Sequence, residues 1–269
     1  MSRIDDVFQK HAVTGSTLFL PYLCGGDPDI ETSLTLMRET EAAGADILEI
    51  GIPFSDPLAD GPTIQKAIQR SLQRNTRISD VFSLVEHLRE DSELPLVLMS
   101  YYNPIFRYGE QRFVKDAREA GADGVLVVDL PPEEGQPFFD HANQQGLDTV
   151  LLATPTTGPE RVRELSQLGT GFLYYVTVTG VTGVRSGFNQ NLSEQIRSVS
   201  HQSELPMVMG FGVSEIEPIR PYLDAVQGVV AGSTLVEKIE ENIGNTDAMI
   251  EALGSKVRSL AEPLHGAVR

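Results

Sequence analysis

The feature that most constrains the fold is a regular alternation of short, continuous apolar runs with segments of helical periodicity. The apolar runs cover residues 17–23, 47–52, 94–102, 123–130, 148–153, 171–178, 205–212 and 225–232. Helical spacing is found at 3–11, 30–43, 64–72, 81–88, 113–120, 133–145, 162–168, 192–199, 214–223, from 233 onward, and at 247–260. Strands without polar alternation are buried on both faces, as in a parallel sheet. The chain is therefore predicted to form a single (β/α)8 barrel over residues 1–269, with an extra N-terminal helix and additional helices after strands 2 and 8.

A doubly wound sheet is the alternative architecture for alternating strands and helices. It usually has a Gly-x-Gly-x-x-Gly turn after an early strand, and this sequence has none there. No linker and no shift in composition divides the 269 residues into two domains. We therefore expect one barrel.

Composition argues against several classes of function. A net charge of −17 and a pI of about 4.6 disfavour nucleic-acid binding, which needs a basic surface. The one cysteine, Cys24, allows neither an internal disulfide nor a thiolate metal cluster, and we interpret it as a small apolar residue beside a strand end. No leader-like segment opens the chain and no apolar run approaches ~20 residues, so a cytoplasmic location is expected.

The stretch 46–63, DILEIGIPFSDPLADGPT, contains the first candidate chemistry. Glu49 interrupts the apolar residues of the second strand, and Asp56 and Asp60 follow on the loop at its C-terminal end. A carboxylate in apolar surroundings loses its hydration, which raises its pKa unless it is paired. Active sites of this fold lie on the loops at the carboxyl ends of the strands, so the three acids predict a site of proton transfer. Glu49 taken alone would be better explained as a buried structural ion pair or an edge-strand residue, but the acids on the loop beside it favour the functional interpretation.

Carboxyl groups are the reactive side chains that remain once other chemistries are considered. None of the five lysines lies in a predicted strand, so a Schiff base has no candidate. The five histidines are scattered, lack ligand spacing, and are expected at the surface. We therefore expect cofactor-free acid–base chemistry, with Glu49 as general acid or base and Asp60 ionised to accept a hydrogen bond or stabilise positive charge. Tyr174, in the sixth strand, is a further candidate; a packed strand aromatic is the alternative.

A phosphate site is predicted where strands 7 and 8 end. These loops read Gly-Phe-Gly (210–212) and Gly-Ser-Thr (232–234), the second at the start of a helix. Glycines let backbone N–H groups approach an anion closely, and helix N-termini favour negative charge. Gly183 and Arg185, in the glycine-rich stretch 179–189, could add an amide and a positive charge. The alternative for each glycine pair is an ordinary turn.

Several motifs make this sequence resemble the α subunit of tryptophan synthase over essentially its whole length. They are LEIGIPFSDPLADGPTIQKA (48–67), GGDPD (25–29), TGVTGVRSG (179–187), GFGVS (210–214) and AGS (231–233). The resemblance implies a lyase that cleaves indole-3-glycerol phosphate to indole and glyceraldehyde 3-phosphate by a retro-aldol step. It also implies that Glu49, Asp60 and Tyr174 are the catalytic residues.

The resemblance extends to the substrate pocket. Phosphate contacts are implied at Gly183, Gly212, Gly232 and Ser233. The apolar indole pocket is implied at Tyr22, Ile64, Met99, Leu126 and Phe211, with Tyr22 where phenylalanine is more usual and Met99 where leucine is common. Thr182, Gly183 and Arg185 belong to a glycine-rich loop, residues 179–189, that we expect to be a mobile lid over the substrate.

The family's α subunit works with a pyridoxal-phosphate-dependent β subunit, in an α2β2 assembly in which the cofactor belongs to the partner. Contacts with the partner are implied at Asp56, Pro57, Asn103, Pro104, Phe106, Pro131, Glu133 and Glu134. Phe106 follows an Asn-Pro break and would be an exposed aromatic, as is typical of interfaces.

Three alternative functions share parts of this pattern. A stand-alone lyase releasing free indole would have the same catalytic residues, and a non-catalytic activating subunit would not need both Glu49 and Asp60. A sugar-phosphate isomerase would share the phosphate site but has no use for the SDPLADGPT loop. The sequence leaves open which group removes the proton of the C3′ hydroxyl.

Overall fold

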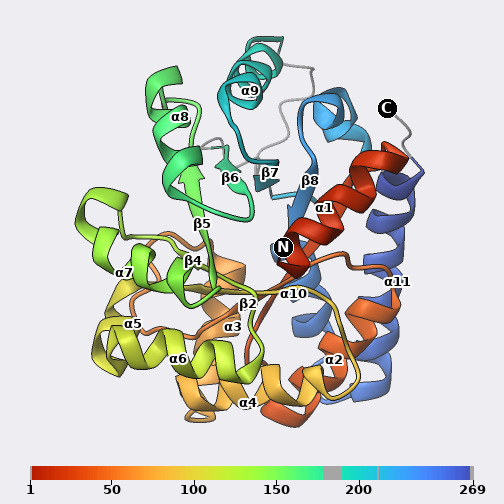
Figure 1. Cartoon of the computed structure of the whole chain (residues 1–269). Coiled ribbons are helices and arrows are strands. Elements are labelled where there is room, and N and C mark those ends of the chain that lie inside the picture. Colours follow the sequence, from red (N-terminus) through yellow and green to blue (C-terminus); the bar gives the residue numbers. More distant parts are fainter. Residues whose placement is uncertain (1, 178–189, 211, 267–269) are drawn as a thin grey trace.

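The protein forms a closed parallel barrel in the computed structural model, which describes residues 2–177, 190–210 and 212–266 (Figure 1). Each strand pairs in parallel with the next, and the eighth closes the barrel against the first. The predicted (β/α)8 barrel is thus confirmed. The strands are β1 (Leu18–Cys24), β2 (Leu48–Gly51), β3 (Leu96–Ser100), β4 (Gly124–Val127), β5 (Asp148–Ala153), β6 (Leu173–Val176), β7 (Met207–Gly210) and β8 (Gly228–Ala231).

Helices surround the barrel, and two of them follow β2 and two follow β8, as predicted. None of the described helices is long and apolar enough to cross a membrane. The helices are α1 (Arg3–Thr14), α2 (Ile30–Ala42), α3 (Pro62–Gln73), α4 (Ile78–Arg89), α5 (Tyr102–Tyr108), α6 (Glu110–Ala120), α7 (Pro132–Gln144), α8 (Pro159–Leu168), α9 (Gln190–Gln202), the 3-10 helix η1 (Glu217–Ala225), α10 (Ser233–Glu241) and α11 (Thr246–His265).

Two helical segments differ from the prediction. The strand predicted within 94–102 ends at Ser100, and Asn103 and Pro104, the break expected after it, lie in the first turn of α5, where a proline loses no helical hydrogen bond. The carboxylate of Asp129 accepts a hydrogen bond from the Tyr102 amide at 2.6 Å and so supports the start of this helix. The segment expected as an α-helix at 214–223 is the 3-10 helix η1, in which Pro221 has no N–H for an α-helical bond.

The inside of the barrel is filled by alternate residues of the strands. Tyr22 of β1, Glu49 of β2 and Val97 of β3 stand side by side in register. At the opposite end of the barrel from the strand C-termini, α1 contributes Ile4 and Phe8 to the same interior cluster. The ring of Phe8 lies 5.8 Å from that of Phe172. Because α1 packs against this end, the C-terminal ends of the strands are where a substrate can enter.

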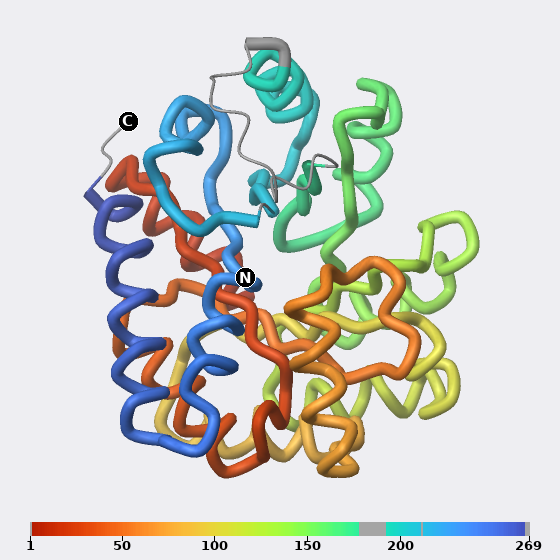
Figure 2. Tube along the Cα trace, turned by 180° about the vertical axis from the view of Figure 1, so that it is seen from behind, coloured from red at the N-terminus to blue at the C-terminus, as the bar shows by residue number. Residues whose placement is uncertain are grey.

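The two terminal helices, α1 and α11, approach each other at their C-terminal ends (Figures 1 and 2). They meet at Asp46, whose carboxylate pairs with His11 Nε2 at 3.2 Å and with His265 Nε2 at 2.7 Å. The same carboxylate accepts a hydrogen bond from the Phe19 amide at 2.7 Å. Both histidines are half-buried, so they lie at the surface only in part and are held there by Asp46. The hydrogen bond to Asp46 raises the pKa of His265, whereas burial lowers the pKa of His11.

Candidate active site

Glu49 is the most unusual ionisable group in the described part of the chain. Its side chain is completely buried in the barrel, with 0% exposure. Neither carboxyl oxygen has a hydrogen-bond partner among the described residues, so these residues offer no structural ion pair. Burial raises the pKa of Glu49 from 4.5 to about 8, which confirms the expected direction. At neutral pH this carboxyl group is mostly protonated, in apolar surroundings, and can therefore act as a general acid.

Asp60 lies on the loop between β2 and α3. A hydrogen bond from Tyr101, the residue that directly follows β3, fixes its position. The Tyr101 hydroxyl donates a hydrogen bond to Asp60 Oδ2 at 2.7 Å and accepts one from the Ala59 amide at 2.9 Å. The Tyr101 ring packs on Phe54, with centroids 5.3 Å apart. Burial raises the pKa of Asp60, and the hydrogen bond from Tyr101 lowers it. This loop acid is therefore half-buried and oriented by Tyr101.

Tyr101 is a site residue that the sequence did not assign. Its position at the end of β3 was visible, but its contact with Asp60 joins residues 41 positions apart. Only the packing of the β2–α3 loop over β3 brings the two together. The signal available beforehand was an aromatic residue at a strand C-terminus, which is too common to single out a role.

Two further tyrosines lean over glycines of neighbouring strands. A Cβ atom built on Gly51 would lie 2.2 Å from the hydroxyl oxygen of Tyr22, and one built on Gly210 would lie 2.3 Å from Cε1 of Tyr174. No side chain larger than hydrogen fits at either glycine without moving a ring. Burial raises the pKa of both phenols well above 10, and the charge of Glu49 adds to this. Both hydroxyls therefore stay protonated at the barrel mouth.

The predicted phosphate site is partly described. Gly232 is the residue before α10, and Ser233 is the first residue of that helix, whose first N–H groups have no partner within the helix. A Cβ atom built on Gly212 would meet no atom within 4 Å, so the backbone there is open to a ligand. Thr182, Gly183 and Arg185 lie outside the described residues, so the structure says nothing of the predicted lid.

The predicted indole pocket is brought together in the barrel interior. Tyr22, Ile64 and Leu126 are buried, and Met99 is half-buried beside them in one apolar cluster. Phe211 lies outside the described residues. In the described ranges, no three His, Cys, Asp or Glu side chains are grouped so that they could hold a metal ion.

Comparisons with known proteins agree with this geometry. The family model described as "Tryptophan synthase alpha chain" matches residues 8–265. A tryptophan synthase alpha chain of Geotalea uraniireducens is 45% identical over 260 residues, covering 97% of each chain. The solved structure of the corresponding subunit from Legionella pneumophila superposes with a TM-score of 0.91 at 36% identity, covering 98% of each chain. The α-subunit structure from Pyrococcus furiosus gives 0.83 at 37% identity, covering 93% of this chain and 98% of that one.

The chain belongs to the tryptophan synthase alpha chain family. As a member of this family it is a lyase that acts on indole-3-glycerol phosphate. Of the remaining predicted residues, most lie on the surface around the same end of the barrel.

The residues predicted to contact a partner follow β2, β3 and β4. Phe106 is 63% exposed, which confirms the expected exposed aromatic, and its ring centroid lies 5.9 Å from that of Tyr102, with the two ring planes tilted by 44°. Leu58, which the sequence analysis did not select, is 92% exposed on the loop after β2. Of the other members, Pro57 and Pro104 are half-buried, and the exposed ones are Asp56, Asn103, Pro131, Glu133 and Glu134.

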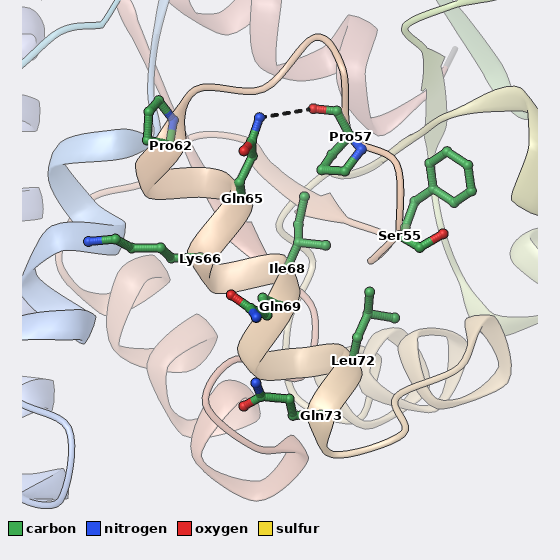
Figure 3. Close-up of a pocket in the computed structure, with 10 residues that line it drawn as sticks. Ser55, Pro57, Pro62, Gln65, Lys66, Ile68, Gln69, Leu72 and Gln73 are labelled. Atoms are coloured by element: carbon green, nitrogen blue, oxygen red, sulfur yellow. Dashed lines mark hydrogen bonds between the residues drawn. The ribbon is translucent and has the colours of Figure 1, made fainter.

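A surface groove of about 630 Å³ lies between the β2–α3 loop and one side of α3 (Figure 3). Its apolar wall includes Ile68 and Leu72, and Gln65 reaches back toward the Pro57 carbonyl oxygen at 3.5 Å. Neither Glu49 nor any other predicted catalytic residue lines it. The groove is therefore distinct from the barrel mouth where the ionisable groups gather.

Proposed function

We propose that Glu49 is the acid that starts the cleavage of indole-3-glycerol phosphate by this α chain. The observation that carries the proposal is the state of its carboxyl group: fully buried, with both oxygens unpaired and a pKa of about 8. A carboxyl group with no protein partner can give its proton to a carbon atom of a ligand. An ion pair at this position would hold the carboxylate charged and remove that capacity.

The reaction follows from the two oriented acids. Glu49 protonates C3 of the indole ring, which places a positive charge on the ring nitrogen. Asp60, oriented by Tyr101, accepts the hydrogen bond of that N–H group and stabilises the charge. The bond between C3 and C3′ then breaks, its electrons return to the ring, and the C3′ hydroxyl loses its proton as the aldehyde forms. Glu49, now a carboxylate, is the base for this second proton.

Binding of the substrate uses the rest of the barrel mouth. We place the phosphate at Gly212, Gly232 and Ser233, where the start of α10 offers free amides, with Gly183 and Arg185 completing the site. The indole ring fits the apolar cluster of Tyr22, Ile64, Met99 and Leu126, next to Phe211, with Tyr174 at its edge. Residues 179–189, including Thr182, act as the lid. The chain itself needs no cofactor for this chemistry.

The partner is a tryptophan synthase β subunit, which receives the indole and holds the pyridoxal phosphate. The exposed apolar side chains of Leu58, on the β2–α3 loop, and Phe106, on α5, support this part of the proposal, because both segments follow strand C-termini, at the same end of the barrel as the acids. A related solved structure from Mycobacterium tuberculosis is described as tryptophan synthase in its aminoacrylate-bound form. We propose an α2β2 assembly of single-domain α chains, located in the cytoplasm.

Indole release from indole-3-glycerol phosphate, with and without a tryptophan synthase β subunit, tests both halves of the proposal. Weak cleavage by the chain alone that rises with β supports the partnership, whereas full activity unmoved by β favours the stand-alone lyase. Glu49→Gln should abolish cleavage while preserving the circular dichroism spectrum. Unchanged activity in this variant removes the acid assignment.

The interface is tested separately with Phe106→Ala. This change should weaken binding of the β subunit by about 10-fold or more, since buried aromatic anchors dominate interfaces. The activity of the isolated chain should stay the same, because Phe106 does not line the barrel mouth. Val13→Ala is a matched control, as Val13 is 89% exposed on α1, away from these loops. Equal affinities for both variants would exclude this surface.

A further inference from the structure

The hydroxyl group of Tyr22 lies on the mouth side of the acid Glu49. The two residues are neighbours in register on adjacent parallel strands. In a strand, residues two apart share a face, so Gly51 stands on the inward face of β2, one step closer to the barrel mouth than Glu49. Because a Cβ on Gly51 would be 2.2 Å from the Tyr22 hydroxyl oxygen, this oxygen occupies the place where a side chain of residue 51 would begin.

The other end of the Tyr22 side chain lies beside the predicted phosphate site. A Cβ built on Gly232 would lie 3.3 Å from both Cβ and Cδ1 of Tyr22. Gly232 caps α10, whose free amides face the place proposed for the phosphate. The side chain thus extends from the phosphate end of the site to the space above Glu49.

The Tyr22 hydroxyl can make a hydrogen bond that the described residues do not provide. Tyr22 is only 6% exposed, and its hydroxyl makes no hydrogen bond with another described residue. Buried phenol groups normally find a hydrogen-bond partner. Glu49, two residues before Gly51 on β2, also has no partner for either oxygen among the described residues. Two polar groups without a partner among the described residues, at successive levels of the barrel mouth, indicate that a polar part of the ligand lies between them.

The glycerol chain of the substrate is that polar part. In the binding mode proposed above, on which this inference rests, the indole C3 atom lies at Glu49 and the phosphate at Gly232. The three carbons between them must run alongside Tyr22. We propose that Tyr22 positions the substrate by donating a hydrogen bond from its hydroxyl to the C3′ oxygen. The C3′ O–H bond then points toward Glu49, which takes that proton when the aldehyde forms.

The phenol suits this task because it remains a neutral donor. Burial, with the nearby Cys24 and the charges of Asp60 and Glu49, raises its pKa well above 10. Asp60 is the proposed acceptor for the ring N–H group. Asp60 therefore acts on the indole side of the C3–C3′ bond, and Tyr22 acts on the glycerol side. A phenylalanine at this position would line the indole pocket equally well but could not orient the hydroxyl.

The test compares Tyr22→Phe with the wild type on two ligands. The first is indole-3-glycerol phosphate, assayed for kcat and KM. The second is 3-(indol-3-yl)propyl phosphate, which keeps the ring and the phosphate but has no hydroxyl groups, assayed as an inhibitor. Loss of one neutral hydrogen bond predicts a fall in kcat/KM of about 3- to 10-fold for the first. The inhibition constant for the second should stay within about twofold.

Tyr175→Phe is the matched control, because Tyr175 is a fully buried tyrosine that belongs to the outer core cluster, and its hydroxyl has no partner in the described part of the chain. It should leave both constants unchanged. An unaffected kcat/KM in Tyr22→Phe, or a parallel change for both ligands, overturns the positioning role and leaves Tyr22 as packing. A wild type that does not cleave the substrate overturns the proposed function, and this inference with it.

Discussion

Replacing Glu49 by glutamine should stabilise the folded protein, and increasingly so as the pH rises. Glutamine has nearly the shape of a protonated glutamic acid and does not ionise. In the folded protein the pKa of Glu49 is about 8, raised by burial from 4.5. Between these pH values the unfolded chain releases a proton that the folded chain keeps, and this difference favours unfolding of the wild type.

The size of the effect follows from the two pKa values. Below pH 4.5, Glu49 is protonated in both states, and the two proteins differ only by an amide in place of a carboxyl group. Above it, each pH unit lowers the stability of the wild type by about 1.4 kcal/mol relative to the variant. The advantage of Glu49→Gln should therefore grow by about 3 kcal/mol by pH 7 and level off near 5 kcal/mol above pH 8.

Urea unfolding followed by far-ultraviolet circular dichroism, at pH 5, 6, 7 and 8 and constant ionic strength, measures this difference. The other titrating groups are common to both proteins, so their contributions cancel in the comparison. Glu86→Gln removes an exposed carboxylate on α4 and controls for the loss of one charge. A stability difference between Glu49→Gln and wild type that stays constant from pH 5 to 8 would refute the raised pKa and the acid role built on it.

Three further predictions concern activity. The value of kcat/KM should fall about tenfold per pH unit above about pH 8, because the protonated form of Glu49 is the active one; a profile that rises through pH 9 contradicts this. Tyr101→Phe removes the donor to Asp60 and should lower kcat/KM by about 10-fold or more in steady-state assays, with unchanged rates excluding an orienting role. Gly210→Ala places a methyl group against the Tyr174 ring and should lower kcat/KM while the protein stays folded; wild-type kinetics would show that the ring position is unimportant.

The fold could be predicted well because its signal is local and repeated. Continuous apolar strands bounded by helical segments recur along the whole chain, and each unit supports the same architecture. The errors in the predicted helices and strands also came from local sequence signals. Asn103 and Pro104 resemble a strand terminator, yet a proline is equally compatible with the first turn of a helix, which α5 forms when Asp129 accepts the Tyr102 amide.

The sequence by itself determined that an acid stands in an apolar strand and that a second acid follows on the next loop. Burial of Glu49 follows directly from its apolar neighbours, because in a parallel barrel both faces of a strand are covered. Only the tertiary structure decided what surrounds these acids. The bond from Tyr101 to Asp60, and the phenols of Tyr22 and Tyr174 above glycines of the next strands, depend on strand register and side-chain direction. Such contacts join residues far apart in the chain, and no local pattern of residue types specifies them.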